Sequence, residues 1–351
     1  MMTLNLPEIC RNQSLSDAEW QEIRGKIIRT LCEEEYGFLP PLPKSVDWEI
    51  TETDNEFCAG KAPLVKAMLK ITLSNNSSFS FPVSAVIPSG AENIPFFVYI
   101  SFSPHTPDKF LPSEEIADNG YGVFSFYYED VTADNADFSN GLPGELGIKD
   151  NSDCGKIALW AWAVMRVMDF ACSFPLLDFS RAAVAGHSRL GKTALLAGAL
   201  DERFKFIISN NSGCCGAAVS RGKKGETIRN ITDAFGYWFK ASFKKFADNE
   251  EALPFDQHFL IAASAPRFVY VSSAQDDSWA DPHAELLGCK AAGSVWEKLG
   301  FSGLIIDDEE PVIGKQYNGG RIAYHVRKGG HFLSREDWRN FMEFINVKCH
   351  E

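Results

Sequence analysis

The chain has 351 residues, of which 45% are apolar and 13% aromatic, so it can bury the core of one large α/β domain or of two smaller ones. This composition excludes a disordered chain, a collagen-like repeat and a small scaffold held by disulfides. The 47 Asp and Glu residues outnumber the 34 Lys and Arg residues, which gives a net charge of −13. We therefore expect no nucleic-acid or anionic-membrane partner, since both would be repelled.

Three further features bear on compartment and cofactors. The longest apolar run, residues 157–165, ends at Arg166, well short of the roughly 20 residues that cross a bilayer. The opening residues lack the basic start and apolar stretch of a secretory leader, and nine cysteines without a Cys-x-x-Cys pair indicate neither a disulfide framework nor a zinc site. We expect a cytoplasmic protein without metal or cofactor, or a secreted one if a leader precedes these residues.

The N-terminal part of the chain predicts one helix and one hairpin. Ser16 and Glu19 form a capping-box pattern, in which each side chain satisfies a free backbone amide of the other residue, so a helix should begin here and end near Glu35. Alternating apolar residues over 66–73 and 79–87 flank a polar, turn-forming stretch. This pattern is typical of an antiparallel hairpin.

Beyond residue 94 the pattern changes to solid apolar strands separated by helical stretches. Such strands are covered on both faces and belong to a largely parallel sheet. The predicted strands are 96–102, 122–127, 182–185, 204–209, 268–273 and 322–326, and the predicted helices are 112–119, 156–174, 188–200, 284–299 and 335–347. We predict a helical extension over residues 1–45, packed on a single domain over residues 46–351.

Ser188 is the candidate nucleophile, because it lies between an apolar strand and a helix-forming run. Gly186 precedes it by two residues and Gly191 follows it by three, whereas Leu190 takes the second glycine position of the usual Gly-x-Ser-x-Gly elbow. The helix N-terminus would direct positive potential to the place where an anion develops. An ordinary serine at a tight strand–helix turn would produce the same pattern.

A serine nucleophile needs a histidine base and a carboxylate that orients this base. In α/β-hydrolases the three residues occur along the chain in the order serine, acid, histidine. His331 follows a strand and two glycines, a turn from which an imidazole can reach over the sheet edge. The acidic loop after the preceding strand holds Asp276, Asp277 and Asp281. We favour Asp277, which lies four to five residues past the strand, although it could instead cap a helix.

Two further histidines and two tryptophans are predicted to lie outside the site. His325 lies inside an apolar strand and is expected in the core, and His187 is expected to point away from the nucleophile next to it. Trp160 and Trp162 lie on an apolar helix and are also expected in the core.

An ordered set of segments resembles the bacterial glucuronoyl esterases of carbohydrate esterase family fifteen. The resemblance covers about residues 96–331 and rests on residues 186–192, 225–231, 236–240, 247–254, 256–258, 265–267 and 277–282. It implies an α/β-hydrolase three-layer sandwich with a mostly parallel central sheet and antiparallel N-terminal strands. It also implies hydrolysis of 4-O-methylglucuronoyl esters of xylan-derived saccharides through an acyl-enzyme.

The resemblance assigns roles to single residues. It implies Ser188 as nucleophile, His331 as base and Arg189 as an oxyanion-stabilising group, and Arg189 offers both a backbone amide and a permanently charged guanidinium. The residues that would contact the uronic acid are Lys192, Glu226 and Trp279. The partner is then a carbohydrate ester.

Two positions depart from the family pattern. Asn211 stands where many members have a catalytic glutamate, and since an amide carries no charge, the acid role should pass to Asp277. His187 stands where fungal members have cysteine. Two alternatives stay open: an acetyl xylan esterase on the same scaffold, and a catalytically silent, carbohydrate-binding homologue.

Overall fold

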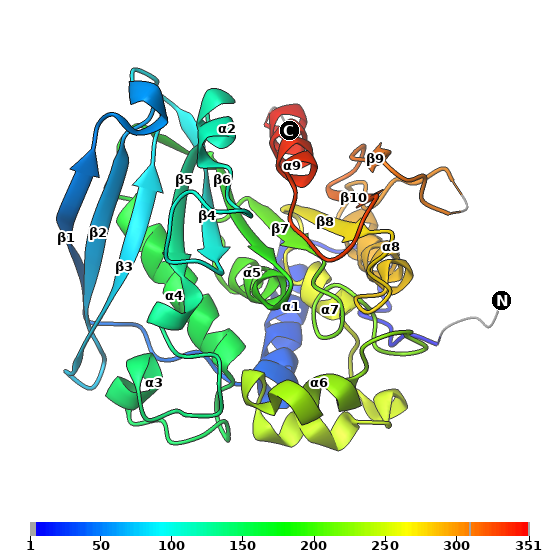
Figure 1. The fold of residues 1–351 in the computed structure, drawn as a ribbon. Coiled ribbons are helices and arrows are strands. Elements are labelled where there is room, and N and C mark those ends of the chain that lie inside the picture. The colour runs from blue at the N-terminus through cyan, green and yellow to red at the C-terminus, as the bar shows by residue number, and fades with distance from the viewer. Residues whose placement is uncertain (1–4, 309, 350–351) are drawn as a thin grey trace.

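A single mixed β-sheet runs through the computed structural model, which describes residues 5–308 and 310–349 (Figure 1). Its strands are β1 (Ser45–Asp54), β2 (Leu64–Thr72), β3 (Ser78–Val86), β4 (Ile94–Ser101), β5 (Gly122–Tyr127), β6 (Leu177–His187), β7 (Phe206–Asn210), β8 (Phe268–Ala274), β9 (Gln316–Tyr317) and β10 (Ile322–Arg327). They lie in the order β1-β2-β3-β5-β4-β6-β7-β8-β10-β9.

The sheet has a parallel centre and antiparallel edges. From β5 through β4, β6, β7 and β8 to β10, each strand is parallel to its neighbour. At one edge β1, β2 and β3 form an antiparallel meander that joins β5, and at the other edge β9 pairs antiparallel with β10. The predicted α/β-hydrolase sandwich with antiparallel N-terminal strands is confirmed. The two-residue strand β9 was not predicted, because it carries no apolar run.

Helices cover both faces of the sheet. They are α1 (Asp17–Leu31), α2 (Ser113–Asp118), α3 (Gly141–Leu146), α4 (Lys156–Ala171), α5 (Arg189–Leu200), α6 (Ile228–Phe235), α7 (His258–Ala262), α8 (Pro282–Lys298) and α9 (Arg335–Lys348). Alternate residues of a strand face opposite sides of a sheet. Accordingly Phe96 and Val98 belong to the core that includes α4 and α5, whereas Phe97 and Tyr99 belong to a second core with α9.

Shorter helical turns complete the fold. They are the π-helix η1 (Cys32–Tyr36) and the 3₁₀ turns η2 (Phe57–Gly60), η3 (Tyr128–Asp130), η4 (Gly236–Trp238), η5 (Ala241–Phe246) and η6 (Glu250–Ala252).

Trp160, Trp162 and His325 are buried, as predicted. None of the helices in the described part of the chain has the length and apolar character that a bilayer crossing requires.

Helix α1 begins as the capping box predicts and packs on the rest of the molecule. Ser16 and Glu19 make both reciprocal cap hydrogen bonds, but the α-helix ends at Leu31 and continues as η1. The Trp20 indole N–H donates to the Ala265 carbonyl oxygen at 2.9 Å. Such buried contacts join α1 to the sheet-covering helices, while a domain boundary at residue 45 stays a prediction.

Candidate active site

Ser188 lies in a sharp turn between β6 and α5. Its backbone has φ 57° and ψ −128°, a positive-φ conformation that costs free energy for a residue with a side chain and is typical of a nucleophile elbow. A Cβ atom at Gly186 would lie 2.0 Å from the Leu190 carbonyl oxygen, so only glycine fits there. The turn therefore exposes the serine hydroxyl at the carboxyl end of the sheet.

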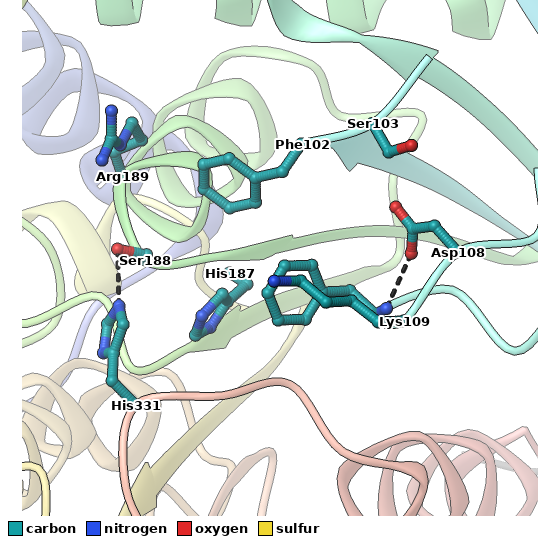
Figure 2. A pocket seen from close by; sticks show the side chains of 9 residues that line it. Phe102, Ser103, Asp108, Lys109, His187, Ser188, Arg189 and His331 are labelled. Atoms are coloured by element: carbon teal, nitrogen blue, oxygen red, sulfur yellow. Dashed lines mark hydrogen bonds between the residues drawn. The ribbon is translucent and has the colours of Figure 1, made fainter. Parts of the chain in front are cut away.

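The hydroxyl of Ser188 is linked to a carboxylate through one imidazole. His331 Nε2 lies 2.8 Å from Ser188 Oγ (Figure 2), and His331 Nδ1 lies 2.6 Å from Asp277 Oδ2. His331 follows β10 and Asp277 follows β8, so adjacent parallel strands bring the two loops together. With the proton on Nδ1, the imidazole donates to the carboxylate and accepts from the hydroxyl.

The carboxyl group of Asp277 is buried and remains suited to carry charge. Burial by itself would raise its pKa, but the hydrogen bond and charge of His331, together with the amide of Asn211, outweigh this and hold the pKa below its ordinary value. The Asn211 side chain donates to Asp277 at 2.8 Å, and its own Oδ1 has no hydrogen-bond partner among the described residues.

The other two acids of the loop are not bonded to His331 in the described structure. Asp281 caps α8 by accepting from the Ala284 amide at 3.1 Å, and it also accepts from the Lys224 amide at 2.6 Å. The helix-capping role considered for Asp277 therefore falls to Asp281. Asp276 is exposed.

His187 does not point away from the site, so that expectation was wrong. Its ring lies 4.6 Å from the ring of His331, centroid to centroid, and its Nδ1 lies 2.6 Å from Asn210 Oδ1. Burial, and after it the neighbouring charge of His331, lower the pKa of His187 to about 3. His187 is therefore a neutral imidazole packed against the candidate base (Figure 2).

Arg189 follows the candidate nucleophile in the chain, and its guanidinium lies in a cage of rings. It forms an ion pair with Asp134, and its central carbon lies 4.7 Å from the ring centroid of Trp238 and 5.6 Å from those of Phe102 and Phe235. A weakly hydrated, planar cation suits such surroundings.

Two cavities meet at Ser188, Arg189 and His331, which line both of them. The first cavity has a volume of about 600 Å³, and its further lining is Phe102, Ser103, Asp108, Lys109, Phe110 and His187 (Figure 2). The second has a volume of about 330 Å³, and its further lining is Lys192, Asn211, Ser212, Gly213, Glu226, Phe235, Trp238, Asp277, Trp279 and Ala280.

All three residues that the resemblance assigns to sugar contact line the second cavity. Lys192 is buried, and its ammonium donates to the Ser212 carbonyl oxygen. Glu226 is half-buried, and Trp279 is 55% exposed, so its indole face is open to a ligand. Within the described residues, no group of three or more His, Cys, Asp or Glu side chains is placed to hold a metal ion.

Comparison with known proteins decides the family. A family model of fungal glucuronyl esterases matches residues 71–300. The chain belongs to the glucuronoyl esterase family. A carbohydrate esterase from an unknown prokaryotic organism is 42% identical over 238 residues, 66% of this chain and 55% of that protein. The 4-O-methyl-glucuronoyl methylesterase of Podospora anserina is 29% identical over 303 residues, 82% of this chain and 58% of that protein.

A solved structure supports the same assignment over nearly the whole glucuronoyl esterase chain. It is that of a promiscuous family-fifteen esterase from a marine bacterial metagenome, with a TM-score of 0.85 and 30% identity over 98% of this chain and 97% of the other. The present chain spans little more than half the length of the two curated relatives, 55% and 58%.

Membership in the glucuronoyl esterase family corrects the expected location. Enzymes of this family are typically secreted and act on plant cell-wall polysaccharides, which contradicts the cytoplasmic expectation. All nine cysteines are free, and six of them are buried. Buried cysteine packs as a small apolar side chain, so unpaired cysteines were a poor guide to the compartment.

Proposed function

We propose that this member of the glucuronoyl esterase family is a serine esterase that hydrolyses esters of glucuronic acid, including its 4-O-methyl form, on xylan-derived saccharides. The observation that carries the proposal is the hydrogen-bonded series Ser188–His331–Asp277 at the junction of two cavities. An ester has an acyl half and an alcohol half, and each needs room beside the nucleophile.

In the proposed reaction, His331 Nε2 takes the proton of Ser188 Oγ as that oxygen attacks the ester carbonyl carbon. The carbonyl oxygen becomes an oxyanion, which the Arg189 guanidinium stabilises, and Asp277 stabilises the imidazolium. The C–O bond to the alcohol then breaks, and the alcohol oxygen takes the proton from His331. Water, activated by the same imidazole, hydrolyses the resulting acyl-enzyme.

The second cavity is the proposed site of the glucuronoyl half. Trp279 presents an aromatic face on which a sugar ring can pack, and Glu226 can accept hydrogen bonds from sugar hydroxyls. Lys192 adds a cationic donor in the same cavity. The first cavity then receives the alcohol half, against the rings of Phe102 and Phe110.

Comparing two esters tests this proposal against the acetyl esterase. The benzyl ester of glucuronic acid should be hydrolysed with a much higher kcat/KM than nitrophenyl acetate, because only the former fills the second cavity. A wide preference for the acetate would reject the glucuronoyl assignment. Equal background hydrolysis by the wild type and by Ser188→Ala would instead favour the silent carbohydrate-binding homologue.

A further inference from the structure

Asp134 gathers four hydrogen-bond donors on one carboxylate. Its side chain is 7% exposed, and Oδ2 pairs with Arg189 Nη1 and accepts from the Tyr128 hydroxyl at 3.0 Å. Oδ1 accepts from Trp238 Nε1 at 2.6 Å and from the Tyr237 hydroxyl at 3.2 Å. A carboxylate only accepts hydrogen bonds when ionised, so this one is well satisfied and its position is firmly set.

The ion pair gives the Arg189 guanidinium its direction. The faces of Trp238, Phe102 and Phe235 surround the cation, but ring faces leave a planar group free to rotate within its plane. The Arg189 Nε is buried and has no hydrogen-bond partner among the described residues. The ion pair with Asp134 therefore sets the orientation of the Arg189 guanidinium within its plane.

We propose that Asp134 is a positioning residue for ester hydrolysis, which holds the Arg189 guanidinium where the oxyanion forms. This inference rests on the proposed function, in which Arg189 stabilises that charge. A donor that is already oriented needs no reorganisation when the transition state develops. Because the same carboxylate anchors Trp238, it also fixes one wall of the second cavity.

A double-mutant cycle with Asp134→Asn and Arg189→Met tests the inference on two substrates, the benzyl ester of glucuronic acid and nitrophenyl acetate. An oxyanion forms in both reactions, so Asp134→Asn should lower kcat about tenfold or more on each. The KM for the acetate should stay unchanged, because this substrate makes no sugar contact. In the Arg189→Met background, Asp134→Asn should change kcat by less than about twofold.

The matched control is Asp201→Asn. Asp201 is also a buried carboxylate paired with an arginine, Arg203, but it follows the other end of α5. Its replacement should lower the melting temperature as much as Asp134→Asn does and leave kcat unchanged. If Asp134→Asn does not fold, Asp134→Glu, which keeps the charge and displaces it by one methylene, enters the same cycle.

Three results would overturn the inference: additive effects of the two substitutions on kcat, a lower melting temperature without a loss of kcat, or an Arg189→Met variant as fast as the wild type. Failure of the proposed function looks different. The wild type would then hydrolyse the acetate but no glucuronate ester, and the cycle on the acetate would still decide the role of Asp134.

Discussion

Asn211 and His331 converge on one oxygen atom: Asn211 Nδ2 lies 2.8 Å and His331 Nδ1 lies 2.6 Å from Asp277 Oδ2. The amide thus holds the carboxylate from the position at which the resemblance implies a glutamate in many family members. In this protein Asp277 supplies the negative charge beside His331, and Asn211 anchors that carboxylate with a hydrogen bond.

Asp277→Asn should lower kcat by roughly 10³- to 10⁴-fold, because an amide neither fixes the imidazole tautomer nor stabilises the imidazolium. Asp281→Asn is the control, since asparagine still caps a helix and Asp281 makes no hydrogen bond to His331 in the described structure. Steady-state kinetics on the benzyl ester of glucuronic acid measure both. A larger loss from Asp281→Asn would move the acid role to that residue.

Asn211→Glu should restore at least about tenfold of the rate that Asp277→Asn loses, because it returns a carboxylate to the neighbourhood of the imidazole. Asn211→Gln is the control in the Asp277→Asn variant. Glutamine has the side-chain length of glutamate but no charge, so it should restore none of the lost rate. In the wild-type background, Asn211→Glu places two carboxylates side by side. Their repulsion should shift the acid limb of the kcat/KM profile to higher pH; an unchanged limb would contradict this placement.

Trp279→Ala should raise the KM for the glucuronate ester about tenfold, which corresponds to roughly 1–1.5 kcal/mol of lost ring contact. The KM for nitrophenyl acetate should not change. Trp48→Ala serves as control, because Trp48 is 40% exposed on β1 and lines neither cavity. Equal KM changes from the two substitutions would exclude a sugar contact at Trp279.

Glu35 should make the protein less stable as the pH rises. It is fully buried beside Gln257, whose Nε2 lies 3.0 Å from Glu35 Oε2, and burial raises the pKa of Glu35 from 4.5 to about 7. Since the folded state holds this proton more tightly than the unfolded state, the stabilisation is complete below pH 4.5 and is lost as the pH rises through 7. The loss by pH 8 is on the order of 3 kcal/mol.

Chemical denaturation at several pH values between 5 and 8 measures this effect. Glu35→Gln should flatten the decline in unfolding free energy, because the amide does not titrate. Glu33→Gln, at an exposed position two residues earlier, should leave the decline as it is in the wild type. If the unfolding free energy of the wild type does not fall between pH 5 and pH 8, the pKa of Glu35 is not raised in the folded state and the prediction is wrong.

Sequence patterns predicted the strands and turns whose structure depends only on a short stretch of neighbouring residues. Strand β5 was predicted at its observed bounds, since a buried strand needs only an apolar run, and Ser188 and His331 each follow a strand and lie next to glycines. Helix α1 ends before the predicted point, because η1 continues it with a wider turn. The composition of residues 32–36 does not distinguish these two kinds of helix.

The parts that were not predicted depend on contacts between distant segments. Asp134 reaches Arg189 across 55 residues, and no spacing rule connects a loop after β5 to the start of α5. His187 was misplaced because alternation along a strand fails at the elbow, where the backbone turns toward the helix. Asp277 was favoured among the three aspartates by its distance from the strand alone, whereas its hydrogen bond to His331 depends on the pairing of β8 with β10.

The meeting of two cavities at a single hydroxyl has a kinetic consequence. In the proposed reaction, once the bond to the alcohol is cleaved, the alcohol can diffuse out through the first cavity while the glucuronoyl group stays bound to Ser188 in the second. The vacated space can then admit either water or another small alcohol. The order of events would be ping-pong, and added methanol would divert the bound sugar into a methyl ester.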